Sequence, residues 1–288
     1  MPPAELALMK ALGRPVRVTG RCALSGGHIS HVERIHTDAG TFVVKTHPRP
    51  PAGFFQAEAD GLTALRRSGT SLAVPDVVAV DDGPPAVLVL EDLGQGNAAQ
   101  GFDEAFGRGL AELHRHSSAK FGFHQNNFCG ATSQPNAWMD RWIDFYATER
   151  LGHQLTSAES AGLLSSSDSD RIRRAINRLD TIIDEPTEGP ALIHGDLWAG
   201  NLHVTSIGAP ALIDPAAYFG HREAELGMMT LFGGFSTRVY AAYHETFPLD
   251  AGWRERNPMY QLYHLLNHLN LFGNGYHSQV MSVVNRFV

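Results

Sequence analysis

The chain has 288 residues, of which 43% are hydrophobic and 18% charged, as expected for a globular protein with a sizeable core. A net charge of −7 provides no bulk basic field for nucleic acid or an anionic membrane. No apolar run approaches the ~20 residues of a membrane span. Cys22 and Cys129 show no metal-ligand spacing, and the N-terminus lacks the pattern of a signal peptide, so we expect a reduced, cytoplasmic location.

The first third of the chain predicts an antiparallel sheet. A short helix over residues 6–12 ends at Gly13, and a second helix with an apolar face covers residues 54–67. Alternating or continuous apolar segments separated by glycine-rich turns predict five strands, over residues 16–24, 31–36, 41–45, 77–80 and 86–90.

A series of residues in this region is typical of a sheet that clamps a nucleotide. Gly26 and Gly27 lie in the turn that ends at Ser30, where backbone N–H groups could approach phosphate oxygens closely. Lys45 ends the third strand, and Glu58 lies near the start of the following helix. Taken singly, these are a hairpin turn, a solvated lysine and a carboxylate that complements the helix dipole. In series they favour a Lys45–Glu58 ion pair.

The polar, flexible segment that begins with Glu91, Asp92 and Leu93 predicts the boundary between two lobes, over residues 1–93 and 94–288. Its backbone groups could contact an adenine edge, and a plain linker is the alternative. After it, helices are expected over residues 104–116, in the aromatic-rich segment 137–151, from the serine cluster at 165–167 to about Asp184, and over residues 236–247 and 255–272. Residues 117–135 are expected to form a loop.

The most informative segment spans residues 192–204 and continues to Pro215. Two apolar runs bracket a loop of the form H-x-D-x-x-x-x-N, the catalytic-loop spacing of phosphoryl-transfer enzymes related to protein kinases. Asp196 would orient an attacking hydroxyl, while Asn201 and Asp214 would hold a metal ion against nucleotide phosphates. An ordinary polar hairpin is the alternative, which the complete constellation disfavours.

Several segments resemble the fructosamine kinase (ketosamine-3-kinase) family. His194–Asn201 resembles its H-G-D-L-W-S-G-N motif, and further matching segments are 214–226, 231–235 and 260–273. The resemblance implies an α+β, bilobal protein-kinase-like fold, with an N-terminal five-stranded antiparallel sheet plus a helix and a mainly helical C-terminal lobe. It also implies ATP-dependent phosphorylation of a ketosamine at its 3-hydroxyl; the product is unstable and releases the amine, which amounts to deglycation.

The resemblance also implies roles for single residues. Lys45 and Glu58 would hold the phosphates of ATP, and residues 91–93 would contact adenine. The other implied roles are phosphate-loop shaping for Gly26, Gly27 and Ser30, general base for Asp196, and magnesium ligation for Asn201 and Asp214. The chain departs from the family pattern at three positions: Ala199 replaces a serine, Ser30 an asparagine, and Pro215 follows the metal carboxylate, as in small-molecule kinases.

Substrate contacts are less determined by the sequence. Trp198 could offer an apolar face to a sugar ring or amine substituent, or could anchor the core. His221, Arg222 and Glu223 could bind sugar hydroxyls, or could fasten the catalytic loop to the next helix. His264 and His268 have metal-ligand spacing without a visible third ligand, which favours core histidines.

Two alternative functions remain open at this point. One is a kinase of another small hydroxylated amine, such as an aminoglycoside or choline; the other is a catalytically silent nucleotide-binding module. The intact set of Lys45, Glu58, Asp196, Asn201 and Asp214 disfavours a silent module. The sequence leaves undetermined the preferred sugar, the oligomeric state, and whether the substrate is a free amine or a glycated lysine.

Overall fold

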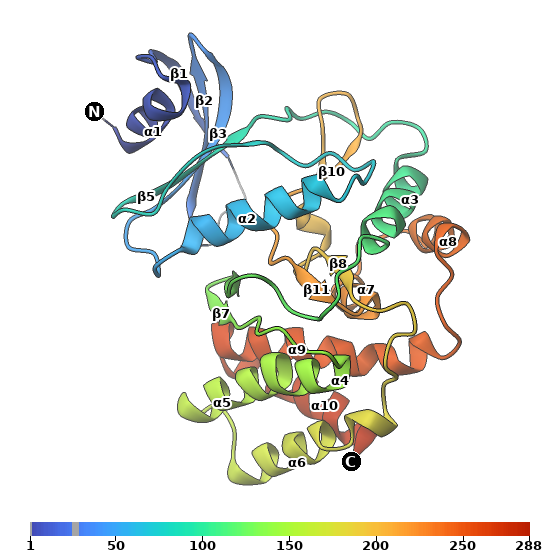
Figure 1. The fold of residues 1–288 in the computed structure, drawn as a ribbon. Coiled ribbons are helices and arrows are strands. Elements are labelled where there is room, and N and C mark those ends of the chain that lie inside the picture. Colours follow the sequence, from blue (N-terminus) through green and yellow to red (C-terminus); the bar gives the residue numbers. More distant parts are fainter. Residues whose placement is uncertain (1, 25–28) are drawn as a thin grey trace.

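The computed structural model describes residues 2–24 and 29–288. A five-stranded antiparallel sheet with helices α1 and α2 lies above a mainly helical portion (Figure 1). The predicted α+β, bilobal architecture, with a five-stranded antiparallel sheet and a mainly helical C-terminal lobe, is therefore confirmed. Among the described residues, no helix is both long and apolar enough to cross a membrane.

The sheet has the strand order β1-β2-β3-β5-β4, so the fourth strand along the chain lies at the edge. Each neighbouring pair is antiparallel. The strands agree with the predicted ones to within a few residues: β1 (Val18–Ala23), β2 (His31–Thr37), β3 (Gly40–His47), β4 (Val77–Asp81) and β5 (Ala86–Glu91).

Strand β5 lies inside the sheet and is buried on both faces. Its side chains alternate between the faces, as strand geometry requires. Val87 and Val89 pack in the cluster that contains helix α1 (Pro3–Leu12), whereas Leu88 and Leu90 pack in the cluster of helix α2 (Phe54–Arg67). One helix on each face explains why this strand is a continuous apolar run in the sequence.

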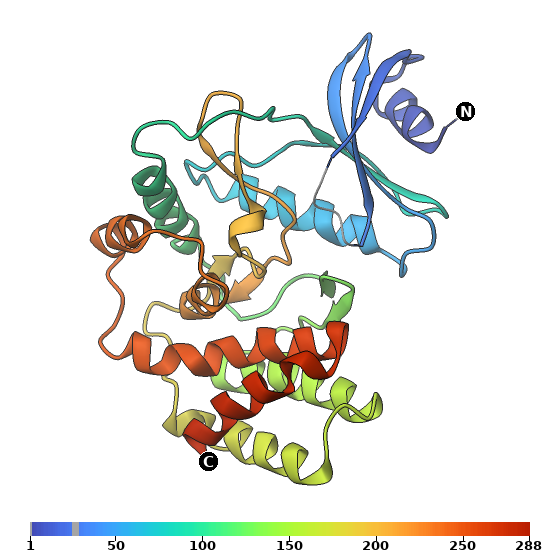
Figure 2. The same ribbon diagram turned by 180° about the vertical axis from the view of Figure 1, so that it is seen from behind.

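The C-terminal lobe is organised around helix α9, which packs against α7, α5 and α10 (Figure 2). This part of the chain also contains three short antiparallel strand pairs, β6–β7, β8–β11 and β9–β10, and strands β8 and β9 flank the catalytic loop. The helices are α3 (Phe102–His114), α4 (Trp142–Phe145), α5 (His153–Ser160), α6 (Ser166–Ile176), α7 (Arg222–Leu231), α8 (Thr237–Thr246), α9 (Trp253–Phe272) and α10 (His277–Phe287). The short strands are β6 (Asn127–Cys129), β7 (Thr132–Gln134), β8 (Ala191–Ile193), β9 (Leu202–Val204), β10 (Pro210–Leu212) and β11 (Tyr218–Gly220).

The helical lobe differs from the expectation in several places. Ser165 caps α6 as predicted, because its hydroxyl accepts the Asp168 N–H in a capping box. The helix ends at Ile176 rather than near Asp184, because the chain turns there and buries Leu179 in the core. The expected loop over residues 117–135 contains the β6–β7 pair, and α10 was not predicted.

The segment that links the lobes is held along the β9–β10 turn rather than lying free. The Leu93 carbonyl accepts a hydrogen bond from the Ser206 N–H at 3.0 Å, and the Ala99 N–H donates to the Gly208 carbonyl at 3.0 Å. A Cβ atom at Gly96 would lie 2.7 Å from the Thr205 carbonyl oxygen, so only glycine permits this approach. These contacts hold the linker against the β9–β10 turn.

Candidate active site

A cavity of about 760 Å³ lies where the sheet, helix α2 and the catalytic loop meet. Most of the predicted site residues that the structure describes line it. They are Ser30, Lys45, Glu58, Asp196, Trp198, Asn201 and Asp214. Gly26 and Gly27, the predicted phosphate-loop glycines, lie outside the described residues. The cavity therefore brings together side chains that are far apart in the chain, such as those of Lys45 and Asp214, which are separated by 169 positions.

Lys45 is buried and contacts two carboxylates. Its Nζ donates to Glu58 Oε1 at 2.6 Å, which is the predicted ion pair, and to Asp214 Oδ1 at 2.5 Å, which was not predicted. Burial alone would lower the pKa of Lys45, but the carboxylates of Asp214 and Glu58 raise it above its usual value on balance. Lys45 is therefore a fixed cation that links β3, α2 and the segment of Asp214.

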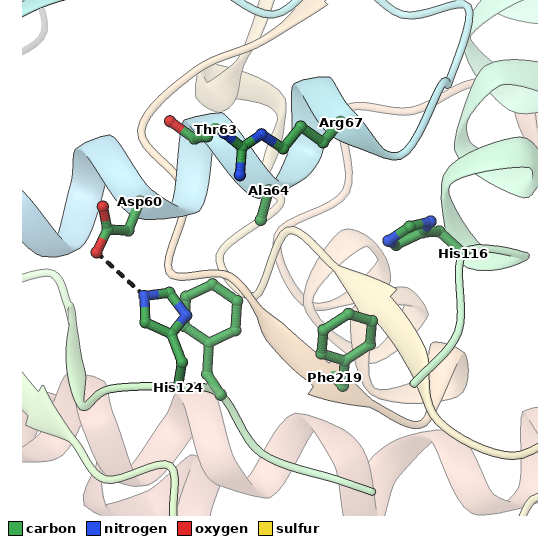
Figure 3. A pocket seen from close by; sticks show the side chains of 8 residues that line it. Asp60, Thr63, Ala64, Arg67, His116, His124 and Phe219 are labelled. Carbon is green, nitrogen blue, oxygen red and sulfur yellow. Dashed lines mark hydrogen bonds and ion pairs between the residues drawn. The ribbon is translucent and has the colours of Figure 1, made fainter. Parts of the chain in front are cut away.

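The face of α2 next to Glu58 is fastened to the helical lobe. Gly61 allows close packing there, since a Cβ atom on it would lie 3.2 Å from Pro215 Cγ. Asp60 accepts hydrogen bonds from Gln125 Nε2 at 2.6 Å and from His124 Nε2 at 3.1 Å. Figure 3 shows the second of these bonds beside a smaller pocket of about 330 Å³. The helix that carries Glu58 is thus held in its position beside Asp214.

Glu225 of α7 binds the backbone at the start of the catalytic loop. Its buried carboxylate accepts hydrogen bonds from the backbone N–H groups of His194 and Gly195, the latter at 3.1 Å. Gly195 has a φ of 83°, and a Cβ atom on it would lie 2.2 Å from a carbonyl oxygen. Sequence reasoning missed the role of Glu225, although the residue lies within a family-like segment, because a separation of about 30 positions carries no local pattern.

His194 connects the segments that carry Asp196 and Asp214. Its Nε2 lies 2.8 Å from the Ile213 carbonyl oxygen, and its Nδ1 accepts the Asp196 N–H at 3.3 Å. Burial lowers the pKa of His194, which fits a neutral ring that donates from Nε2 and accepts at Nδ1. One imidazole therefore positions the backbone before Asp214 and that of Asp196.

Asp196, Asn201 and Asp214 form the acidic wall of the cavity. Burial, together with the nearby charges of Asp214 and Glu225, raises the pKa of Asp196 to about 7. Asp214 has a φ of 57°, a left-handed conformation that is uncommon for a residue other than glycine and occurs at functional sites. Asn201 Nδ2 donates to the Asp196 carbonyl at 2.8 Å, which directs its Oδ1 elsewhere.

The donor set of this wall fits a hard divalent cation. The Asp214 carboxylate and the Asn201 amide oxygen are oxygen ligands of the kind that Mg²⁺ prefers. The carboxylates of Glu58, Asp196 and Asp214 line the cavity together with one ammonium group, that of Lys45, and so outnumber it. A cation held there would offset this excess of negative charge.

The backbone after Asp214 is held by a buried polar network that the sequence did not reveal. Asn127 Nδ2 donates to the Ala217 carbonyl at 2.8 Å, and Gln134 Nε2 donates to the Ala216 carbonyl at 3.0 Å. The Tyr263 hydroxyl donates to Gln134 Oε1 at 2.6 Å. These amides come from the β6–β7 pair, whose strands of three residues are too short to show a periodic pattern.

Trp198 lies on the cavity wall with 42% of its surface exposed, so it is not a core anchor. Its ring covers Gly200, where a Cβ atom would lie only 2.2 Å from the indole. An aromatic rim, defined as Phe232, His268, Phe272 and Tyr276, also lines the cavity, with neighbouring ring centroids 4.9–6.1 Å apart. This rim was not predicted, because its members come from three separate segments.

The prediction that His221, Arg222 and Glu223 contact sugar hydroxyls needs correction. All three are buried and lie outside the cavity lining. Their side chains bind Glu188 and residues of α9, which fastens the start of α7 within the helical lobe. This differs from the expected alternative, in which they would fasten the catalytic loop. The bonds are His221 Nδ1 with the Tyr260 hydroxyl at 2.7 Å, Arg222 Nε to Glu188 at 2.5 Å, and Arg256 to Glu223 at 2.5 and 2.9 Å.

Glu91, Asp92 and Leu93 do not line the cavity either. Asp92 accepts two hydrogen bonds from Arg34, at 2.7 and 3.0 Å, and the Glu91 carboxylate accepts the Asp76 N–H at 3.1 Å. These side chains hold the linker, and the Leu93 carbonyl is bonded to Ser206. Only their remaining backbone groups are candidates for adenine contacts, which stay a prediction.

Comparison with solved structures defines the class of protein. The structure of aminoglycoside phosphotransferase APH(4)-Ia aligns with a TM-score of 0.62 at 15% identity, covering 99% of this chain and 98% of that one, which shows a shared fold. A structure from Thermobifida fusca YX-ER1, described as a candidate fructosamine-3-kinase, aligns with a TM-score of 0.88 at 32% identity, covering 98% and 97%. The fold is that of small-molecule phosphotransferases related to protein kinases.

Sequence comparison then shows the family. A family model described as "Fructosamine kinase" matches residues 3–288. The chain is 37% identical over 280 residues to the chloroplastic protein-ribulosamine 3-kinase of Oryza sativa subsp. indica, covering 96% of this chain and 81% of that protein. The chain belongs to the fructosamine kinase family, as the resemblance of its motifs predicted.

Proposed function

We propose that this protein is an ATP-dependent kinase that phosphorylates ketosamines at the sugar 3-hydroxyl and so initiates deglycation. The observation that carries the proposal is the convergence of Lys45, Asp196, Asn201 and Asp214 on one cavity. Membership of the fructosamine kinase family supports the substrate class. We place the activity in the cytosol, on the basis of cysteine usage in the sequence.

The residues of the cavity have separate roles in phosphoryl transfer. Lys45, held by Glu58, positions the phosphates of ATP. Asn201 Oδ1 and the Asp214 carboxylate would hold Mg²⁺, which neutralises phosphate charge when bound. Asp196 accepts the proton of the attacking hydroxyl, and its raised pKa makes it a stronger base than an ordinary exposed carboxylate. Positioning and electrostatics provide most of the catalysis in such a transfer.

The acceptor would lie between Asp196 and the aromatic rim. Trp198 and the rim offer flat apolar faces to a sugar ring or to the amine substituent. Phe272 is 63% exposed and Trp198 42% exposed, so this end of the cavity is open to solvent. An open end supports acceptance of a variable amine tail, including the side chain of a glycated lysine on a protein.

The direct test is a screen of ATP consumption with fructose-, ribulose- and erythrulose-lysine beside choline and kanamycin. We expect turnover with at least one ketosamine and phosphate transfer to its sugar. Asp196→Asn is the control for chemistry at this site, and its kcat should fall by roughly 10²–10⁴ because the general base is lost. Turnover with kanamycin or choline alone would instead support the alternative of another small-amine kinase.

Trp198→Ala tests the placement of the acceptor. Loss of stacking and apolar contact should raise the KM for the ketosamine roughly ten- to a hundredfold, on the order of 1–3 kcal/mol, with little change in the KM for ATP. Trp138→Ala is a matched control, because Trp138 is 45% exposed but does not line the cavity. Equal ketosamine KM values in the two variants would remove Trp198 from the acceptor site.

The pH dependence of the reaction follows from the pKa of Asp196. A carboxyl group with a pKa of about 7 is protonated, and unable to accept a proton, below that pH. When both substrates are kept far below their KM values, the rate reports the ionisation of the free enzyme. This rate should therefore fall about tenfold per pH unit below about pH 7 and level off above it. A profile that stays flat down to about pH 5 would show that Asp196 titrates like an ordinary aspartate.

A further inference from the structure

Three side chains with different metal-ligating atoms, one of them the proposed base Asp196, lie close together. Cys129 Sγ, a carboxylate oxygen of Asp196 and an imidazole nitrogen of His264 lie within 4.8 Å of one another. They come from β6, the catalytic loop and α9, so their proximity is a product of the fold alone. Cys129 had no metal-ligand spacing in the sequence, and His264 had been paired there with His268 instead.

The imidazole of His264 is buried without a full set of partners. The residue is 4% exposed, and its Nδ1 has no hydrogen-bond partner among the described residues. A buried polar atom without a partner is uncommon and calls for an explanation, such as an ion absent from the structure. Burial lowers the pKa of His264 to about 3, so the ring is neutral, which is the state that ligates metals.

Cys129 is oriented by a neighbouring amide. Asn267 Nδ2 lies 3.3 Å from Cys129 Sγ and donates to it, while Asn267 Oδ1 accepts a hydrogen bond from Gln154 at 3.2 Å. The second bond fixes which end of the amide faces the sulfur. Burial raises the pKa of the Cys129 thiol, and the donor at the sulfur offsets part of that effect. It also orients the sulfur, as hydrogen bonds around a metal site usually do for its ligands.

We propose that Cys129, Asp196 and His264 form an inhibitory binding site for zinc(II), with the fourth position open to the cavity. Zinc favours tetrahedral sets of thiolate, imidazole and carboxylate ligands, at bonds of about 2.0–2.3 Å that place the ligands roughly 3.3–3.8 Å apart. Because the three atoms lie within 4.8 Å of one another, the largest separation has to shorten by about 1–1.5 Å to reach that spacing. An entry path exists, because Cys129 and Asp196 both line the 760 Å³ cavity.

The charge of the site suits a soft divalent ion. On binding, the Cys129 S–H bond breaks, its proton goes to solvent and an S–Zn bond forms. The thiolate and the Asp196 carboxylate then balance the two charges of zinc, and the imidazole is neutral. Magnesium prefers oxygen ligands and would not compete for the sulfur.

Zinc bound in this way occupies the carboxylate of Asp196, so it blocks proton transfer from the acceptor hydroxyl. The inhibition rests on the proposed function, whereas the binding does not.

Binding is tested by titrating the reduced, nucleotide-free protein with Co²⁺, which takes similar ligands and reports sulfur by a thiolate charge-transfer absorption. We expect one equivalent with this band, displaced by Zn²⁺. Cys129→Ser should abolish the band and His264→Gln should weaken Co²⁺ binding about tenfold or more. The matched controls Cys22→Ser and His268→Gln should retain it, because neither residue belongs to the cluster. Absence of the band in the unmutated protein, or its persistence in Cys129→Ser, would overturn the proposal.

Inhibition is tested separately, with saturating Mg²⁺ and a ketosamine as acceptor. Zinc should inhibit the unmutated protein and Cys22→Ser equally, a chelator should reverse the effect, and Cys129→Ser should need about tenfold more zinc or higher. Equal sensitivity of the unmutated protein and Cys129→Ser would overturn the inhibitory role. If no acceptor is phosphorylated, the proposed function fails, while the Co²⁺ titration still decides whether the metal site exists.

Discussion

The ε-ammonium of Lys45 lies between two carboxylates from different lobes, and the rest of the site depends on this contact. A buried charge is costly unless it is paired, so the ammonium fixes the positions of Glu58 and Asp214 with respect to β3. Two carboxylates against one ammonium leave an excess of negative charge. That excess suits a magnesium–nucleotide complex, whose cation would share Asp214 with the lysine.

The surrounding structure holds these groups in place before any substrate binds. Helix α2 packs through Gly61 on Pro215, Glu225 holds the backbone of the catalytic loop, and buried amides hold the carbonyls that follow Asp214. Catalysis by positioning requires such support, because small displacements of reacting groups cost large factors in rate. The acidic wall is therefore held in place opposite an aromatic end of the cavity that is open to solvent, where the proposed function places the acceptor. The same rigid support brings Cys129 and His264 next to Asp196.

The sequence predicted those features that depend on local pattern or on chemistry at fixed spacing. The strands of the sheet, helix α2 and the loop from His194 to Asn201 belong to this group, because periodicity and turn residues are local signals. The pairing of Lys45 with Glu58 was also predicted, since the order strand, lysine, helix, glutamate is typical of kinases.

Features set by tertiary packing could not be predicted in this way. His221, Arg222 and Glu223 share a polar composition with sugar-binding residues, and only burial shows that they fasten α7. Glu225 and the aromatic rim depend on contacts between segments far apart in the chain. The position of Trp198 was left open by the sequence, because exposure is decided by its neighbours.

The most direct test of the central claim is a double-mutant cycle on Lys45→Met and Glu58→Gln, read as kcat/KM for ATP. The exposed pair Lys10–Asp81, at 3.7 Å, provides a control cycle in which the effects should add. If Lys45 and Glu58 act as one unit, the double variant should be about as impaired as the worse single variant. Effects that add to within about 0.5 kcal/mol would show that Glu58 does not position Lys45, and would contradict the account.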